Sequence, residues 1–152
     1  MVAFLAEAEA RGVAVEPRQF PASTHTAADA AVAVGVSLGQ IVKSLVFRAD
    51  DEVVVALVSG PNRLDERKLA VAAGASTASR VDADAARHAT GFPIGGVPPF
   101  GHRSKLRVFV DQDLLQYDEV WAAAGTPNVN FGIAPAALVK AADGVVCDLA
   151  VR

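Results

Sequence analysis

The clearest candidate for a binding or catalytic side chain is a lysine inside an apolar, strand-like segment. Residues 41–47 read IVKSLVF. Alternation along a strand places Lys43 on the face that also carries Ile41, Leu45 and Phe47. An ammonium group on an apolar face either reaches past its neighbours to water or pairs with an anion or a carbonyl group. Lys43 is therefore either a solvated lysine at a strand edge or a cation that binds a ligand at the mouth of an apolar pocket.

A second candidate is the segment 91–102, which reads GFPIGGVPPFGH. Its four glycines and three prolines in twelve residues argue against both helix and strand. Gly95 and Gly96 can turn backbone N–H groups inward at positive φ, and the prolines stiffen the path. Fixed N–H donors suit an anion or a developing oxyanion. The alternative is a rigid connector, and the segment matches neither the dinucleotide-binding nor the Walker pattern.

The densest basic cluster of the chain follows this loop and consists of His102, Arg103, Lys105 and Arg107. The planar fork of arginine suits phosphate groups, although a solvated strand end has the same composition. The whole chain carries 14 Lys and Arg against 17 Asp and Glu, a formal charge of -3. This balance excludes a protein that holds nucleic acid through a global basic field, and it leaves room for a local phosphate-binding patch.

Other kinds of reactive centre have no signature in this sequence. The histidines His25, His88 and His102 lack HxH or HxxxH spacing, so no metal site is expected, and no cofactor motif is present. Ser59 lies in VSGP rather than in a nucleophile elbow, and Cys147 lies in an apolar segment near the C-terminus. Any hydrolysis by this chain would depend on positioning and electrostatics.

Helices and strands that could position these residues follow one another irregularly. Apolar periodicity and cap residues predict helices over 4–11, 26–35, 65–73, 82–89, 111–116 and 135–142. Strands are predicted over 13–15, 41–49, 52–59, 107–110, 120–123, 129–133 and 145–149. Asp50 and Asp51 form a hairpin turn in this scheme. The continuous apolar run 53–58 predicts a strand that is covered on both faces.

The length of the chain favours one domain, spanning 1–152, and the irregular interleaving of strands and helices favours an α/β fold around a mixed sheet. The chain is 52% hydrophobic and 20% charged, which suits a folded protein with a sizeable core. No apolar run approaches the roughly 20 residues of a membrane helix, and the start of the chain does not resemble a signal peptide. A cytoplasmic protein without a membrane partner is expected, in keeping with its single cysteine.

Three segments in this order resemble the YbaK/ProX family: QIVKSLVF (40–47), GFPIGGVPPFGH (91–102) and GTPNVNFGIAPAAL (125–138). This family contains aminoacyl-tRNA deacylases that are related to the editing domain inserted in bacterial prolyl-tRNA synthetases. The likeness runs from about Thr24 to Ala142. It implies a single YbaK-like domain with a curled mixed β-sheet flanked by helices.

The resemblance also implies an activity, which is hydrolysis in trans of the ester that joins a wrong amino acid to tRNA. Cys-tRNA(Pro) or Ala-tRNA(Pro) is the expected type of substrate, held by its acceptor end, with prolyl-tRNA synthetase as a further candidate partner. No metal or cofactor is required. Lys43 matches the family's functional lysine, which holds the terminal adenosine and its phosphate. The segment 95–98 matches the loop whose backbone contacts the aminoacyl group.

The expected catalytic positions are therefore Lys43, Gly95 and Gly96, and we hypothesise that N–H groups of the loop stabilise the ester oxyanion. The residues expected to contact the substrate are Thr26, Ile41, Leu45, Phe47, Val97, Pro98, Phe100, Gly101 and His102. Together with Lys43, the basic cluster at 102–107 is expected to hold the acceptor end weakly.

Two other interpretations remain open from the sequence. A non-catalytic module could use the same pocket to bind an aminoacyl or nucleotide ligand, and a small regulatory domain could bind phosphate on the glycine loop. The sequence also leaves open the oligomeric state and whether the amino acid is alanine, cysteine, serine or threonine.

Overall fold

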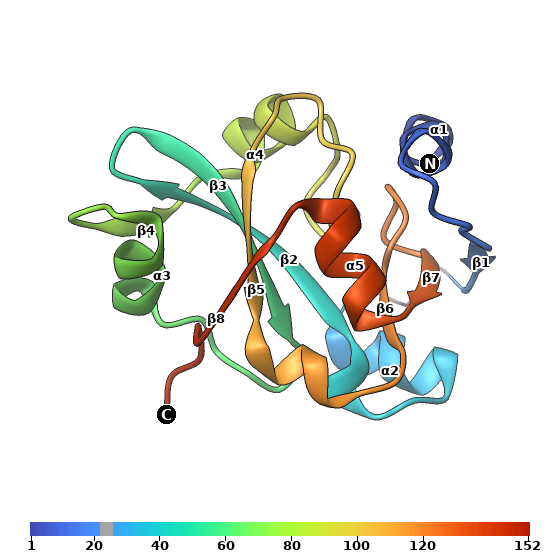
Figure 1. The fold of residues 1–152 in the computed structure, drawn as a ribbon. Coiled ribbons are helices and arrows are strands. Elements are labelled where there is room, and N and C mark those ends of the chain that lie inside the picture. Colours follow the sequence, from blue (N-terminus) through green and yellow to red (C-terminus); the bar gives the residue numbers. More distant parts are fainter. Residues whose placement is uncertain (22–25) are drawn as a thin grey trace.

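A five-stranded mixed sheet forms the centre of the computed structural model, which describes residues 1–21 and 26–152 (Figure 1). In spatial order its strands are β4 (Ala78–Arg80), β2 (Val42–Ala49), β3 (Glu52–Ser59), β5 (Arg107–Asp111) and β8 (Val145–Cys147). β2 pairs antiparallel with β3 and β4, whereas β3, β5 and β8 run parallel. The predicted mixed α/β architecture is confirmed.

The hairpin of β2 and β3 is the longest pairing of this sheet and carries the candidate lysine. Its register pairs Lys43 with Val58 and Ala49 with Glu52. Asp50 adopts φ 51° at the turn, a left-handed conformation that aspartate tolerates better than most residues. The β3 residues 54–58 are completely buried. This confirms that β3 is covered on both faces, as the apolar run predicts.

A second, three-stranded antiparallel sheet lies beside the first. Its order is β1 (Arg18–Gln19), β7 (Val129–Ile133) and β6 (Val120–Ala123). A single parallel bridge between Ile41 and Trp121 joins the two sheets just before β2 begins. The curled sheet is therefore divided in two at this bridge, and Lys43 lies two residues after it.

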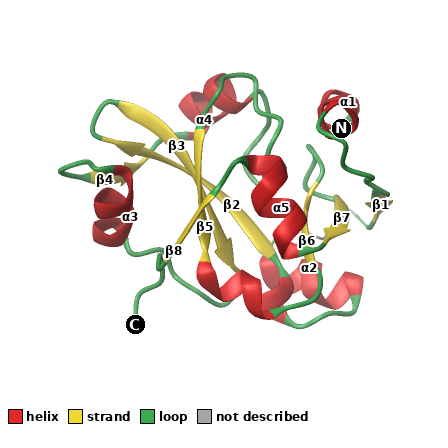
Figure 2. Ribbon diagram, viewed as in Figure 1, coloured by secondary structure: helices red, strands yellow, loops and turns green. Residues whose placement is uncertain are grey.

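Helices cover both faces of the five-stranded sheet (Figure 2). The helices are α1 (Val2–Ala10), α2 (Ala27–Val34), α3 (Glu66–Ala73), α4 (Ala83–Thr90) and α5 (Pro135–Ala142). α5 packs with the three-stranded sheet and α1 in one core cluster, and α3 packs in the other. In residues 1–21 and 26–152, none of the helices has the length and apolar character that crossing a membrane requires.

The predicted cap residues set most of the helix ends. The Thr26 hydroxyl accepts a hydrogen bond from the Asp29 amide at 3.0 Å at the start of α2. Asp65 caps α3 in the same way, with bonds from the amides of Arg67 and Lys68. Gly74 ends α3 at φ 71°, a conformation that glycine adopts without steric cost. These helices begin and end within one residue of their predicted limits.

Some predicted elements are wrong or differ in type. Residues 13–15 do not form a strand; instead Val13 and Val15 pack against the core without pairing. The predicted helix at 111–116 is the 3₁₀ helix η2 (Gln112–Gln116). The last strand, β8, ends at Cys147 instead of residue 149. The short elements β1, β4 and η1 (Leu38–Gln40) were not predicted.

Candidate functional site

A cavity of about 210 Å³ lies where the two sheets separate, and Lys43 is part of its lining. We call it the Lys43 cavity. Its lining comes from α2, the start of β2, the glycine–proline loop and the segment around β6 and β7: Thr26, Ala27, Ala30, Ile41, Val42, Lys43, Ser44, Leu45, Gly95, Val97, Ala123, Pro127 and Asn130. Small apolar side chains dominate this set, so the cavity suits a small ligand group with few polar atoms.

Lys43 is half-buried, and its ammonium group donates a hydrogen bond to the backbone carbonyl of Asn62 at 2.5 Å. Burial lowers the pKa of Lys43 below its usual range, the nearby positive charge of Arg80 lowers this pKa further, and Asp111 acts in the opposite direction. The contact with a neutral carbonyl leaves the positive charge without a direct counter-ion. Lys43 is thus placed to bind an anion or a polar ligand.

A network of carboxylates and amides fixes the carbonyl group that Lys43 contacts. The Asn62 side chain donates to Asp111 at 2.8 Å and to Asp113 at 2.7 Å. The completely buried Asp111 also accepts from the Ser59 amide at 3.1 Å. The backbone amide of Asn62 also donates to the Ser59 carbonyl at 2.9 Å. Because both the backbone and the side chain of Asn62 are bonded, the network limits the positions that the Lys43 ammonium can occupy.

The glycine–proline loop brings Gly95 and Val97 to the cavity. Gly95 has φ 85°, which favours glycine at this position. The Gly96 amide donates to the Pro93 carbonyl at 2.9 Å and closes a turn. A Cβ atom on Gly96 would lie 2.9 Å from the Thr126 Cα, so the loop packs directly on the backbone of the 125–126 segment. Of the two glycines, Gly96 supports the loop and Gly95 lines the cavity.

Two polar atoms in the cavity lining are buried without a hydrogen-bond partner. Within the described ranges they are Ser44 Oγ and Asn130 Nδ2, and no other buried side-chain nitrogen or oxygen is in this state. Both residues line the Lys43 cavity. An unpaired buried polar group costs about 1–3 kcal/mol and requires an explanation. A ligand in the cavity that supplies the missing partners provides one.

The structure brings together six of the residues predicted for the site, and it places the others elsewhere. Those in the cavity are Thr26, Ile41, Lys43, Leu45, Gly95 and Val97. Phe47 lies on the predicted face of β2 but further along the strand, where its ring is buried among the side chains of the α3 cluster. Phe100 is buried in the other cluster, with its ring 5.1 Å from that of Phe4. Gly96 and Pro98 belong to the loop but do not line the cavity.

His102 and Gly101 also lie outside the Lys43 cavity. The His102 Nε2 is 2.7 Å from the Pro98 carbonyl oxygen, and because a carbonyl only accepts, this nitrogen carries the hydrogen. Burial lowers the pKa of His102, the bond to Pro98 opposes this effect, and Arg11 lowers the pKa further. Gly101 packs against Glu7 and Phe4 of α1. His102 therefore holds the end of the loop and does not belong to the lining of the Lys43 cavity.

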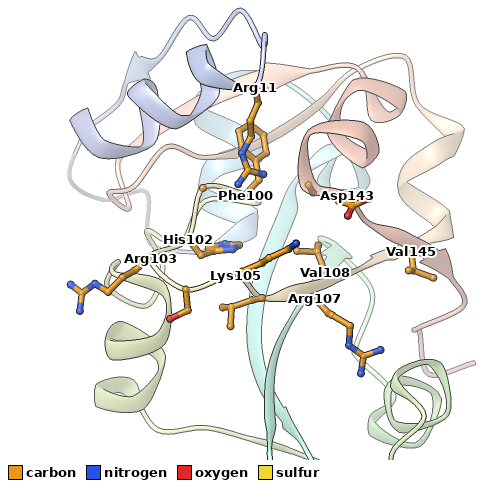
Figure 3. Close-up of a pocket in the computed structure, with 13 residues that line it drawn as sticks. Arg11, Phe100, His102, Arg103, Lys105, Arg107, Val108, Asp143 and Val145 are labelled. Carbon is orange, nitrogen blue, oxygen red and sulfur yellow. The ribbon is translucent and has the colours of Figure 1, made fainter.

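The basic cluster after the loop lines a separate cavity of about 720 Å³, shown in Figure 3 and called the basic cavity below. Arg107 points away from its centre and pairs with Glu52 through bonds of 2.6 and 2.9 Å. Arg103 points away on the other side, and Asp143 adds a negative charge to the lining. The basic cavity shares no lining residue with the Lys43 cavity. Lys43 and the basic cluster therefore line separate cavities, and their joint hold on the acceptor end stays a prediction.

Sequence reasoning missed four residues at or near the cavity: Ser44, Asn62, Arg80 and Asn130. Asn130 lies within the segment GTPNVNFG, whose resemblance could have indicated it. Ser44 follows Lys43 directly, but alternation assigned it to the other face of the strand. Arg80 lies on β4, a three-residue strand without a hydrophobic pattern. For metals, no group of three or more His, Cys, Asp or Glu is placed to hold an ion within 1–21 and 26–152, and His25 lies outside these ranges.

The sequence model of the aminoacyl-tRNA editing domain matches residues 21–141. The uncharacterised protein YwhH of Bacillus subtilis is 33% identical over 118 residues, which cover 77% of this chain and 74% of YwhH. EbsC of Enterococcus faecalis, a proposed Cys-tRNA(Pro)/Cys-tRNA(Cys) deacylase, is 26% identical over 130 residues, 84% of this chain and 79% of EbsC. A proline–tRNA ligase of Nitratidesulfovibrio vulgaris is 38% identical over 97 residues, which cover 64% of this chain and 17% of the ligase.

The fold is also similar to that of a solved structure from the editing enzymes. A solved structure of a proposed trans-editing enzyme for prolyl-tRNA synthetase superposes with a TM-score of 0.94 and 43% sequence identity, over 99% of this chain and 96% of the other. The matched region contains Lys43, the glycine–proline loop and Asn130. The resemblance seen in the sequence is thus confirmed, and this chain belongs to the aminoacyl-tRNA editing domain family.

Proposed function

We propose that this chain is an aminoacyl-tRNA deacylase that acts in trans, releasing a wrongly attached small amino acid from tRNA. The observation that carries the proposal is Lys43, a half-buried cation in the lining of a small, largely apolar cavity that also includes the glycine–proline loop. Family membership and the relation to proposed trans-acting deacylases support it. We further propose that residues 1–152 act as one domain and that the protein works where tRNA is charged, in the cytoplasm.

In the proposed complex, Lys43 binds the terminal adenosine and its phosphate, and the amino acid enters the cavity. Water adds to the ester carbonyl carbon, and the bond from this carbon to the ribose oxygen breaks. The ribose oxygen leaves with the proton that the water gives up, so that the products are the free amino acid and tRNA with a terminal hydroxyl group. Preorganised donors at the carbonyl oxygen would stabilise the transition state.

The structure narrows the choice of oxyanion donors within the loop. Gly96 uses its N–H in the turn to Pro93. Over the part of the chain that is described, the amides of Gly95 and Val97 make no hydrogen bond, and both residues line the cavity. We therefore assign the donor role to Gly95 and Val97 and a supporting role to Gly96.

The cavity also indicates the kind of amino acid. Ala27, Ala30 and Pro127 limit its size, and Ser44 Oγ and Asn130 Nδ2 offer hydrogen bonds. A synthetase pocket distinguishes side chains that differ by one methylene only about 10–200-fold, so a second site that admits the smaller one is needed. We propose alanine or cysteine on tRNA(Pro) as the substrate, with prolyl-tRNA synthetase as the source of the error.

Replacing Lys43 tests the proposal. We expect Lys43→Ala to abolish amino-acid release from Ala-, Cys-, Ser- and Thr-charged tRNA while the melting temperature and circular dichroism stay close to those of the wild type. Lys105→Ala, in the basic cavity, is the matched control and should keep full activity. Full activity of Lys43→Ala would overturn the assignment. RNA binding by the wild-type protein without any release would indicate a non-catalytic binding module instead.

A further inference from the structure

A chain of three hollows runs from the Lys43 cavity along β2 towards α3. The first neighbour, of about 80 Å³, shares Ser44, Leu45 and Val97 with the Lys43 cavity and adds Arg80. Arg80 is also part of the third hollow, of about 490 Å³, together with Phe47, Arg63 and Arg67. The first two hollows thus share three lining residues, and Arg80 links the second hollow to the third.

Arg80 is positioned by its strand and by an aromatic ring. β4 pairs with β2 so that Arg80 lies opposite Phe47, and its guanidinium carbon is 5.8 Å from the centre of the Phe47 ring. Such stacking orients a guanidinium while leaving its N–H groups free to donate. Phe47, which was expected in the amino-acid pocket, instead supports this arginine.

Three arginines and two carboxylates determine the charge of this surface. Throughout residues 1–21 and 26–152, no ion pair joins Arg63, Arg67 or Arg80 to a carboxylate. Asp65 and Glu66 lie in the same hollow, but the Asp65 carboxylate accepts the amides at the start of α3. Arg80 therefore lines the hollow beside the Lys43 cavity without an ion pair in the described part of the chain, and Arg63 and Arg67 lie in the third hollow with Glu66 as its other carboxylate.

Electrostatics links Arg80 directly to the site. Burial is the main cause of the lowered pKa of Lys43, the positive charge of Arg80 lowers this pKa further, and Asp111 opposes the shift less strongly than Arg80 favours it. Lys43 and Arg80 repel each other, and the ammonium of Lys43 is bonded only to a neutral carbonyl in the contacts described above. An anion that binds between or beside these two groups stabilises both. A phosphate next to the terminal adenosine has the right charge for this position.

We propose that Arg80 binds a backbone phosphate of the single-stranded 3′ end of tRNA and that Arg63 and Arg67 extend this phosphate track beyond it. The proposal rests on the proposed function, and it replaces the basic cavity as the place where RNA is held. In the basic cavity Arg107 is committed to Glu52 and Arg11 to Glu7, and Asp143 adds a negative charge. That cavity also shares no residue with the Lys43 cavity.

The test compares Arg80→Gln with the matched control Lys105→Gln on two substrates, alanyl-tRNA and 3′-O-alanyl-adenosine, which lacks the backbone phosphates. Arg80→Gln should raise KM for alanyl-tRNA about tenfold or more, the size expected for a lost charged hydrogen bond. The increase in KM for alanyl-adenosine should be much smaller. Arg80→Lys should recover part of the activity on alanyl-tRNA. Lys105→Gln should behave as the wild type on both substrates.

A binding measurement separates this proposal from the proposed function. The affinity of a fluorescent RNA oligonucleotide ending in CCA should fall about tenfold in Arg80→Gln. The slope of log affinity against log salt should become shallower by about 0.7, the value for one phosphate of a single strand. Unchanged RNA affinity in Arg80→Gln, or an equal loss in Lys105→Gln, would overturn the phosphate track. A wild-type protein that binds this RNA through Arg80 but hydrolyses no ester would refute the deacylase function alone.

Discussion

At the scale of single residues, the candidate site combines a half-buried lysine with two buried polar atoms that are unpaired within residues 1–21 and 26–152. Lys43 could be identified from the sequence because a lysine on an apolar strand face is conspicuous. The unpaired state of Ser44 and Asn130 could not be predicted, because it depends on what β2, β7 and the loop bring near them. The same holds for Arg80, whose closeness to Lys43 follows from the pairing of β4 with β2.

Ser44 and Ser59 offer a direct comparison of an unpaired and a paired hydroxyl group. Ser59 Oγ donates to the Gly39 carbonyl at 2.6 Å. We expect Ser59→Ala to lower the free energy of unfolding by about 1–3 kcal/mol, because it leaves a buried carbonyl unpaired. Ser44→Ala should leave the free energy of unfolding unchanged or raise it, since no hydrogen bond is lost, but it should reduce kcat/KM for alanyl-tRNA.

Chemical denaturation and single-turnover deacylation measure these two effects. If Ser44→Ala destabilised the fold as much as Ser59→Ala does, or left deacylation unchanged, Ser44 would have no role in binding the substrate.

The affinity for RNA should depend on pH through Lys43. Only the protonated lysine attracts phosphate, and its pKa is lowered by burial and by Arg80. Affinity is therefore retained below this lowered pKa and is lost as pH rises through it. The loss occurs at lower pH than it would for an ordinary lysine. Removing the charge at position 80 takes away one cause of the shift, so in Arg80→Gln the loss should move to higher pH.

Binding of the CCA oligonucleotide, measured at a series of pH values and constant ionic strength, gives this midpoint. Asp111 is the acidic group that raises the pKa of Lys43 and so opposes the shift. A midpoint that moves to lower pH in Arg80→Gln would contradict the closeness of the two cations.

At the scale of secondary-structure elements, the caps made much of the fold predictable. Helix α3 begins after Asp65 and ends at Gly74 in the structure, as these cap residues predict. Helix α4 lies between Asp82 and Gly91 in the same way. The strands β1 and β4 have only two and three residues, and their pairing is determined by distant partners rather than by a local pattern. Residues 13–15 show the converse, a strand-like composition that packs on the core without a partner strand.

The glycine–proline loop depends on its packing against the 125–126 segment. A methyl group on Gly96 would lie 2.9 Å from the Thr126 Cα and 3.0 Å from the Gly125 oxygen, both backbone atoms that cannot move aside. We expect Gly96→Ala to displace the loop and to lower kcat by up to about 100-fold, as small misplacements in active sites do. The overpacking should also cost about 1–3 kcal/mol of stability.

Gly74→Ala is the control variant, because it strains the backbone without bringing the new methyl group against a neighbouring atom. Gly74 has φ 71°, and nothing lies within 4 Å of an added Cβ. This variant should lose stability by about 1–2 kcal/mol and keep its rate of deacylation. Equal rates for the two variants in single-turnover assays would show that the position of the loop does not control catalysis.

At the scale of the whole molecule, the formal charge of -3 and the proposed RNA substrate are compatible because the positive groups are local. The sequence pointed to 102–107 as the basic patch, since those residues are close together along the chain. The fold also brings Arg63, Arg67 and Arg80, from different segments, to the two hollows that follow the Lys43 cavity along β2. Such a patch cannot be identified from sequence spacing, because tertiary structure alone assembles it.

The central claim is that the Lys43 cavity removes a small, wrong amino acid from tRNA(Pro). Single-turnover release of labelled amino acid from Ala-tRNA(Pro), Cys-tRNA(Pro) and correctly charged Pro-tRNA(Pro) by the purified protein tests this most directly. We expect rapid release of alanine or cysteine, with proline retained on its tRNA and no release by Lys43→Ala. Release of proline at the same rate, or release of no amino acid from any of the three, would contradict it.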